Sequence, residues 1–167
     1  MKNKLPLLFL LGLILINLLS NSCKKDTQQT IATLFTGGSW QLASVLVTTT
    51  TNLNQVVDTI NVNCDSIQMF TFNTDNTCTY THFNCIAQKK SSGTWSLSTD
   101  QLTLKADMLC DTNATGGKSK PFVNAQIYNL GQYSLVLQTG NYDVIPTSTN
   151  TTKVIRYGFV RQKASIK

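Results

Sequence analysis

Two cysteines near the middle of the chain, Cys64 and Cys85, are spaced so that they could form a disulfide bond. They flank two strand-like runs, residues 66–73 and 77–83, which are joined by an Asn-Thr-Asp-Asn turn that tolerates left-handed backbone. Opposed residues of this hairpin have numbers that sum to 149 or 150, and 64 and 85 sum to 149. The register therefore places the two thiols within one residue of facing each other, which suits a disulfide.

The other two cysteines of this region, Cys78 and Cys110, form either a second bridge or two buried thiols. A metal site built from Cys64, Cys78, His82 and Cys85 is the alternative chemistry. His82 is the only histidine of the chain, and the spacing matches no compact zinc pattern. We therefore expect no metal ion and no cofactor.

Acid–base catalysis would need carboxylates held close together, and the sequence does not supply them. The eight acidic residues are all Asp and are dispersed along the chain. The nearest pairs, Asp58 with Asp65 and Asp107 with Asp111, lie in or beside expected loops. There is no Ser/His/Asp order and no glycine-rich phosphate loop. We expect no catalytic residue and no enzymatic activity.

The first 22 residues are typical of a secretory signal. Lys2 and Lys4 precede an apolar run over residues 5–19, which is short for a transmembrane helix of about 20 residues. An uncleaved signal anchor is the alternative. The ending Leu-Leu-Ser-Asn-Ser-Cys resembles the cleavage site of bacterial lipoproteins, which implies that Cys23 is lipidated. Such Ser-Cys sites followed by lysines resemble those of Bacteroidetes-type lipoproteins.

We therefore divide the chain into a signal peptide (1–22), a lipidated cysteine with its tether (23–30) and one domain (31–167). The resemblance implies an exported protein anchored by lipid to the bacterial outer membrane, facing the periplasm or the surface. Without Lys2 and Lys4 the 14 Lys and Arg become 12, which against 8 Asp leaves a formal charge of +4. The cations are scattered, so we expect no nucleic acid partner. We expect a monomer whose partners are the membrane and a small hydrophobic ligand.

The domain is rich in Thr and Asn and contains short alternating runs, which predicts an all-β fold. One short helix is expected at residues 27–35, before the strands. A second hairpin follows the first, with Leu97 facing Leu102 and Trp95 facing Leu104.

Residues 107–121 are expected to be a long polar loop. Besides the two hairpins, the predicted strands are 39–49, 56–63, 122–130, 133–139 and 152–163. About eight to nine antiparallel strands indicate a barrel or a sandwich.

Gly38 and Trp40 form a Gly-x-Trp motif at the start of the first strand, just after the expected helix. This motif, and the order of the hairpins and the closing strand after it, resembles the lipocalin-like domains of Bacteroidetes-type lipoproteins. The resemblance implies an up-and-down β-barrel (lipocalin-like, or calycin) over residues 30–163. It also implies an arginine that stacks on the motif tryptophan at the closed end of the barrel. By strand alternation Arg161 is the candidate partner of Trp40, as a structural contact, and a solvated arginine at the end of the strand is the alternative.

Alternation along the strands gives an inward-facing set. Its members are Phe70, Phe72, Tyr80, Trp95, Leu97, Leu102, Leu104, Leu135, Leu137, Tyr157 and Phe159. The resemblance implies a carrier or sensor of a small hydrophobic molecule, with Phe70, Tyr80, Trp95 and Tyr157 lining the ligand cup. The same set fits a barrel filled by its own side chains. The alternative function is therefore a solid, tethered interaction module that presents loops 48–55 and 146–152 to a protein or glycan.

Overall fold

The computed structural model describes residues 31–60, 64–86, 90–113 and 115–162. The expected signal peptide and the expected lipidated Cys23 with its tether lie outside the described residues, as do residues 27–30 of the expected helix. Residues 31–36 are helical. The chain divides into two compact units, residues 1–33 and 34–167, and the fold described below belongs to the second. No helix within the described ranges is long and apolar enough to cross a membrane.

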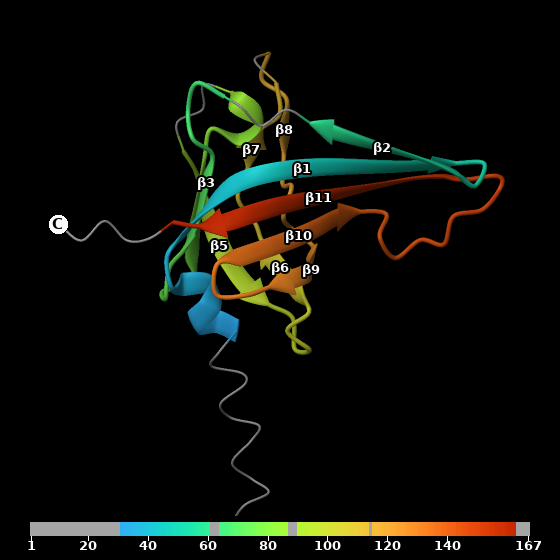
Figure 1. Ribbon diagram of the computed structural model, residues 1–167. Helices are drawn as coiled ribbons and strands as arrows, with labels where there is room; N and C mark the ends of the chain where they lie inside the picture. Colours follow the sequence, from blue (N-terminus) through green and yellow to red (C-terminus); the bar gives the residue numbers. More distant parts are fainter. Residues whose placement is uncertain (1–30, 61–63, 87–89, 114, 163–167) are drawn as a thin grey trace, which may run out of the picture. The chain divides into compact units, whose positions relative to one another are not determined.

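Eight antiparallel strands form a closed barrel, and a ninth strand is added at its edge (Figure 1). The barrel strands are β1 (Ser39–Thr51), β3 (Met69–Phe72), β4 (Thr77–Thr81), β5 (Ser91–Leu97), β6 (Thr103–Ala106), β9 (Ala125–Leu130), β10 (Ser134–Gly140) and β11 (Thr151–Arg161). The added strand is β2 (Asn54–Ile60), and the short elements η1 (Phe83–Cys85), β7 (Cys110–Asp111) and β8 (Lys118–Ser119) lie in the connections. The expected all-β barrel of eight to nine strands is confirmed.

The barrel closes where its first strand β1 pairs with its last strand β11. Their pairing runs from Trp40 opposite Arg161 to Thr51 opposite Thr151, with a bulge between Leu42 and Ser44. The ends of β1 and β11 farthest from Trp40 extend past the rest of the barrel together with β2 (Figure 1). We call the Trp40 end of the barrel the closed end and the opposite end the mouth.

The prediction of a loop over residues 48–55 is wrong. Strands β1 and β2 continue through most of it and join in a tight hairpin. Asn52 and Leu53 make the turn with φ angles of 50° and 65°, the left-handed pair that two-residue hairpins require. All seven residues of β2 are exposed.

The first hairpin has the register predicted for it, whereas the second does not. Phe70 lies opposite Tyr80 in the β3–β4 pair, a sum of 150. In the β5–β6 pair Leu97 faces Leu104, not Leu102 as predicted, and Trp95 faces Ala106, not Leu104. The four-residue turn begins one residue later than expected, because the Ser98 amide donates to the Thr103 carbonyl at 2.9 Å and extends the pairing to these two residues. Leu102 consequently leaves the inward set and is 60% exposed.

The inside of the barrel is filled by side chains, and many of them come from outside the predicted inward set. Phe122, which is fully buried, lies with its ring centroid 4.9 Å from Phe70 and 5.0 Å from Tyr157. The prediction of a polar loop over residues 107–121 is also wrong in part, since Met108 and Cys110 within it are fully buried. Short aromatic contacts therefore connect the walls of the barrel across its axis.

Candidate functional site

The closed end is sealed by the contact between Trp40 and Arg161. These residues are direct partners in the β1–β11 register, and the Arg161 guanidinium carbon lies 4.5 Å from the centre of the Trp40 ring. Trp40 is fully buried, and its indole N–H donates to the Phe35 carbonyl at 3.0 Å. Arg161 also donates to the Leu34 carbonyl. The stacked pair thus ties the end of the last strand to the start of the barrel.

Gly38 packs closely against the end of β11. A Cβ atom at this position would lie 3.2 Å from the Gln162 carbonyl oxygen and 3.4 Å from the Arg161 side chain. A side chain at this position would require these groups to shift by a few tenths of an ångström. The Gly-x-Trp motif therefore has a steric basis in the contact that it supports.

Trp95, which was predicted to line a ligand cup, lies at the same end as Trp40. Its ring centroid is 5.3 Å from Phe72 and 5.7 Å from Phe35, the residue whose carbonyl accepts the Trp40 hydrogen bond. The Trp95 indole donates to the Asn73 carbonyl in the β3–β4 turn at 3.0 Å. Both tryptophans are therefore part of the packing that closes the barrel.

A cavity of about 370 Å³ opens at the mouth. Strands β1, β2 and β11 build one side of it, and the segments before β3 and within η1 build the other. Its lining residues are Leu42, Val45, Ile60, Gln68, Asn84, Cys85, Lys153, Ile155 and Tyr157. Of the four residues predicted to line a ligand cup, this set contains Tyr157, whereas Phe70, Tyr80 and Trp95 lie in the packed interior.

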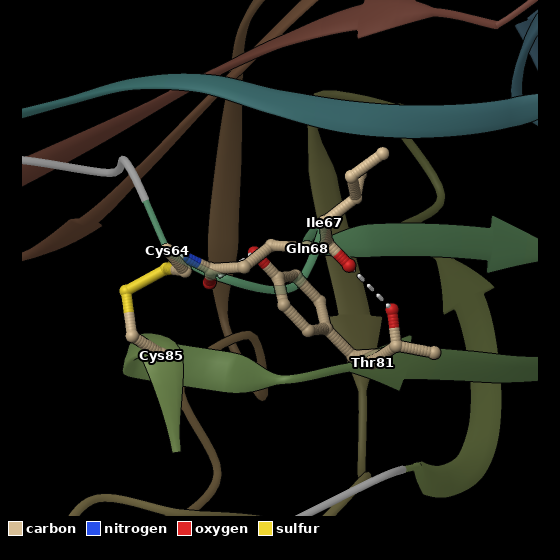
Figure 2. Close-up of a disulfide and its surroundings, with 6 residues drawn as sticks. Cys64, Ile67, Gln68, Thr81 and Cys85 are labelled. Atoms are coloured by element: carbon tan, nitrogen blue, oxygen red, sulfur yellow. Dashed lines mark hydrogen bonds between the residues drawn. A yellow bond between two sulfur atoms is a disulfide. The ribbon is translucent and has the colours of Figure 1, made fainter. Parts of the chain in front are cut away.

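A disulfide holds the rim of this cavity. Cys64 and Cys85 are bonded, with their Cα atoms 5.3 Å apart, as the hairpin register predicted. Figure 2 shows the Gln68 side chain pointing toward this bond. The Gln68 amide nitrogen lies 3.3 Å from the Cys64 sulfur, and its carbonyl oxygen accepts from the Tyr80 hydroxyl at 3.3 Å. The buried Gln68 thus links the disulfide to the barrel wall.

The rim beside the disulfide has an uncommon backbone. His82, Asn84 and Cys85 all have positive φ angles, between 53° and 61°. Such conformations cost free energy in residues other than glycine, and they persist where surrounding contacts fix them. Here the disulfide at Cys85 and the buried ring of Phe83 provide that constraint.

The Tyr157 phenol at the floor of the cavity and the Tyr80 phenol in the packed interior are both held neutral. Burial raises the pKa of the Tyr157 phenol to about 12, against a hydrogen bond to Thr139 that lowers it. Burial likewise raises the pKa of Tyr80 well above its usual value of 10.0. The floor therefore presents the uncharged phenol ring of Tyr157, a surface suited to an apolar group.

Cys78 and Cys110 are two buried free thiols, the second of the two states left open for them. Burial raises the pKa of Cys78 to about 12, and it raises that of Cys110 as well. In the part of the chain that the structure describes, no group of three or more His, Cys, Asp or Glu side chains could hold a metal ion.

Comparison with known families decides the classification of this barrel. The family described as lipocalin-like domain matches residues 36–137, more than half of the chain. The chain belongs to the lipocalin-like domain family. A search of curated proteins found no match to it. The matched range of the lipocalin-like chain includes Trp40, the disulfide and Phe122, and it ends before Arg161 and the Lys153–Tyr157 side of the cavity.

Proposed function

We propose that this lipocalin-like protein is a membrane-anchored lipoprotein that binds a small hydrophobic ligand in the cavity at the barrel mouth. The cavity carries the proposal, because its volume of about 370 Å³ lies within the range of small-molecule sites. Leu42, Val45, Ile60, Ile155 and Tyr157 make most of its lining apolar. A fixed rim and a closed opposite end favour a preformed site with one opening.

The ligand must be compact. An apolar cavity of about 150 Å³ accommodates benzene, which is roughly 25 Å³ for each non-hydrogen atom. On that scale the volume of about 370 Å³ accepts about 15 non-hydrogen atoms. Phe122 limits the depth, since its buried ring packs 5.0 Å from Tyr157 at the floor.

A fluorescence binding assay with a variant that blocks the cavity tests the proposal. The neutral fluorophore 1-aminoanthracene, with about 15 non-hydrogen atoms, is expected to bind the wild type with enhanced emission. Val45→Trp should abolish that binding, because Val45 lines the cavity. Leu46→Trp is the matched control, because Leu46 is the next residue along β1 and is 36% exposed. Equal binding by the wild type and Val45→Trp would overturn the assignment of the site.

For the cellular location, we propose that the protein is exported and lipidated at Cys23, and that the mature chain is held at the outer membrane of a Bacteroidetes-type bacterium. The apolar run 5–19 and the Ser-Cys ending support this. Cys23→Ser should move the protein from the membrane to the soluble fraction and remove incorporation of labelled fatty acid. A variant that stays membrane-bound with Met1 retained would indicate a signal anchor.

A second candidate function is a tethered interaction module without enzymatic activity. Two observations favour it: the barrel axis is filled, and β2 is exposed along its whole length, with Val56 and Val57 more than half exposed. In this case neither 1-aminoanthracene nor native mass spectrometry of protein from its own host would reveal a bound small molecule. We propose a monomer without catalytic residues in either case.

A further inference from the structure

The disulfide at the rim is more open to solvent on one side than on the other. Cys85 is an exposed residue and lines the cavity, whereas Cys64 is partly buried. The two free thiols, Cys78 and Cys110, are fully buried. Because thiol–disulfide exchange requires access to a sulfur, a thiolate from solvent reaches Cys85 more readily than any other cysteine of the described residues.

A buried amide contacts the less open side of the bond. Gln68 is 6% exposed, and its side-chain nitrogen lies 3.3 Å from the Cys64 sulfur and 3.8 Å from the Cys85 sulfur. The Tyr80 hydroxyl donates to the oxygen of the same amide at 3.3 Å. This hydrogen bond keeps the Gln68 N–H turned toward the disulfide, as Figure 2 shows.

The Gln68 N–H favours Cys64 as the leaving group of an exchange reaction. A disulfide sulfur is a weak acceptor, whereas a thiolate carries a full charge, and hydrogen bonds to charged groups are roughly twice as strong as neutral ones. The buried position of Gln68 strengthens this interaction, because little water competes with it. Since a stabilised thiolate leaves faster, exchange has a direction, with attack at Cys85 and departure of Cys64.

The backbone around Cys85 also favours breaking the bond. His82, Asn84 and Cys85 have φ angles of 54°, 53° and 61°, which cost free energy in residues other than glycine. Cleavage of the disulfide removes one of the constraints that hold this turn. Asn84 and Cys85 both line the cavity, so the turn relaxes at the mouth of the barrel.

We propose that Cys85 is a thiol-exchange site at the mouth, with Cys64 as the leaving group and Gln68 as the positioning residue that stabilises it. The reaction partner is a dithiol. Its first thiolate attacks the Cys85 sulfur, a new S–S bond forms, and the electron pair of the Cys64–Cys85 bond leaves on Cys64. Its second thiolate then attacks the first sulfur of the dithiol and releases Cys85.

The exchange balances as a two-electron transfer. The dithiol is oxidised to its own disulfide, and the protein disulfide is reduced to two thiols. Cys64 and Cys85 take up the two protons that the dithiol loses. The reaction needs no molecule inside the cavity, so this inference stands whether or not a small ligand binds there.

Trapping of the mixed disulfide tests the site of attack. The folded full chain is treated with glutathione, a monothiol that stops at the first step, and free thiols are then alkylated with iodoacetamide. Peptide mapping should find glutathione on Cys85 and the alkyl group on Cys64. The absence of an adduct, or glutathione mainly on Cys64, would overturn the proposal. So would an adduct found only in molecules whose Cys78 and Cys110 are also alkylated, because that pattern marks reaction of the unfolded chain.

The rate of reduction by dithiothreitol tests the role of Gln68. Gln68→Met should react about tenfold more slowly than the wild type, because Met has a similar length but no N–H donor for the leaving thiolate. Tyr80→Phe is the matched control. It breaks the same Tyr80–Gln68 hydrogen bond but keeps the Gln68 N–H, so its rate should stay within about twofold of the wild type.

Two results would overturn the role of Gln68: equal rates for the wild type and Gln68→Met, or equal slowing in both variants. The buried thiols Cys78 and Cys110 supply the control for folding, since both should resist alkylation in each variant during the reaction. The mapping of the adduct uses the wild type and therefore decides the site of attack without either variant.

Discussion

Phe122→Ala should remove the side chain that fills the centre of the barrel. The ring is fully buried and contacts Phe70, Tyr80 and Tyr157 with centroid distances of 4.9, 5.7 and 5.0 Å. Truncation of a buried Phe to Ala costs about 3–5 kcal/mol, from lost burial and the cavity left behind. We expect a loss of about 4 kcal/mol, because aromatic neighbours surround the ring and cannot all move into the space.

Urea unfolding measures this loss. With a urea dependence of about 2 kcal/mol per molar, the midpoint should fall by about 2 M. Val123→Ala is the control, since Val123 is the next residue and is 52% exposed, and its midpoint should change by less than about 0.3 M. If the urea midpoint of Phe122→Ala falls by less than about 0.5 M, the filled barrel axis is refuted. It would indicate a Phe122 segment that undocks at little cost.

Three further changes test the ends of the barrel and its interior. Arg161→Lys should lower the free energy of unfolding by about 1–2 kcal/mol, because an ammonium replaces the planar group over Trp40; an unchanged urea midpoint would contradict this. Removing the disulfide in Cys64→Ala/Cys85→Ala should cost about 3 kcal/mol by the same measurement, and a loss below about 1 kcal/mol would argue against it as the staple of the rim. Burial raises the pKa of Cys78 from its usual 9.0 to about 12, so the stability from its bound proton is present below pH 9 and is lost as pH rises toward 12. Cys78→Ala should therefore flatten the fall of stability above pH 9, and an unchanged pH profile would contradict the assignment.

The parts of the fold that were predictable from sequence are those that depend on strand alternation. The β3–β4 register followed from the apolar pattern and the turn, and the Cys64–Cys85 bond followed from the register. The β5–β6 register did not, because Gln101 adopts a left-handed φ of 59° and Asp100 caps the turn by accepting from the Leu102 amide. A shift of the strand register by two residues keeps every side chain on the same face of the sheet. The apolar pattern of the sequence therefore could not exclude the observed pairing.

The site was harder to predict because its depth is set by residues outside the strands. Phe122 follows Pro121 in a turn, and no period applies to a turn residue. Its aromatic character after a largely polar stretch, residues 111–120, was the signal available, and the residue was assigned to a strand. Trp95 was expected at the ligand because it faces inward; its position along the axis depends on the Asn73 carbonyl that its indole binds. Facing inward and lining a cavity are distinct properties in a filled barrel.

The most direct test of ligand binding at the mouth is a two-dimensional ¹H–¹⁵N NMR titration of the lipocalin-like protein with decanoate. The two tryptophan indole signals are built-in controls, since both N–H groups are hydrogen-bonded at the closed end, to Phe35 and Asn73. We predict saturable shifts of the backbone amides of Val45 and Ile155, with both indole signals unchanged. Saturable shifts of the indole signals, with the mouth amides still, would contradict the account.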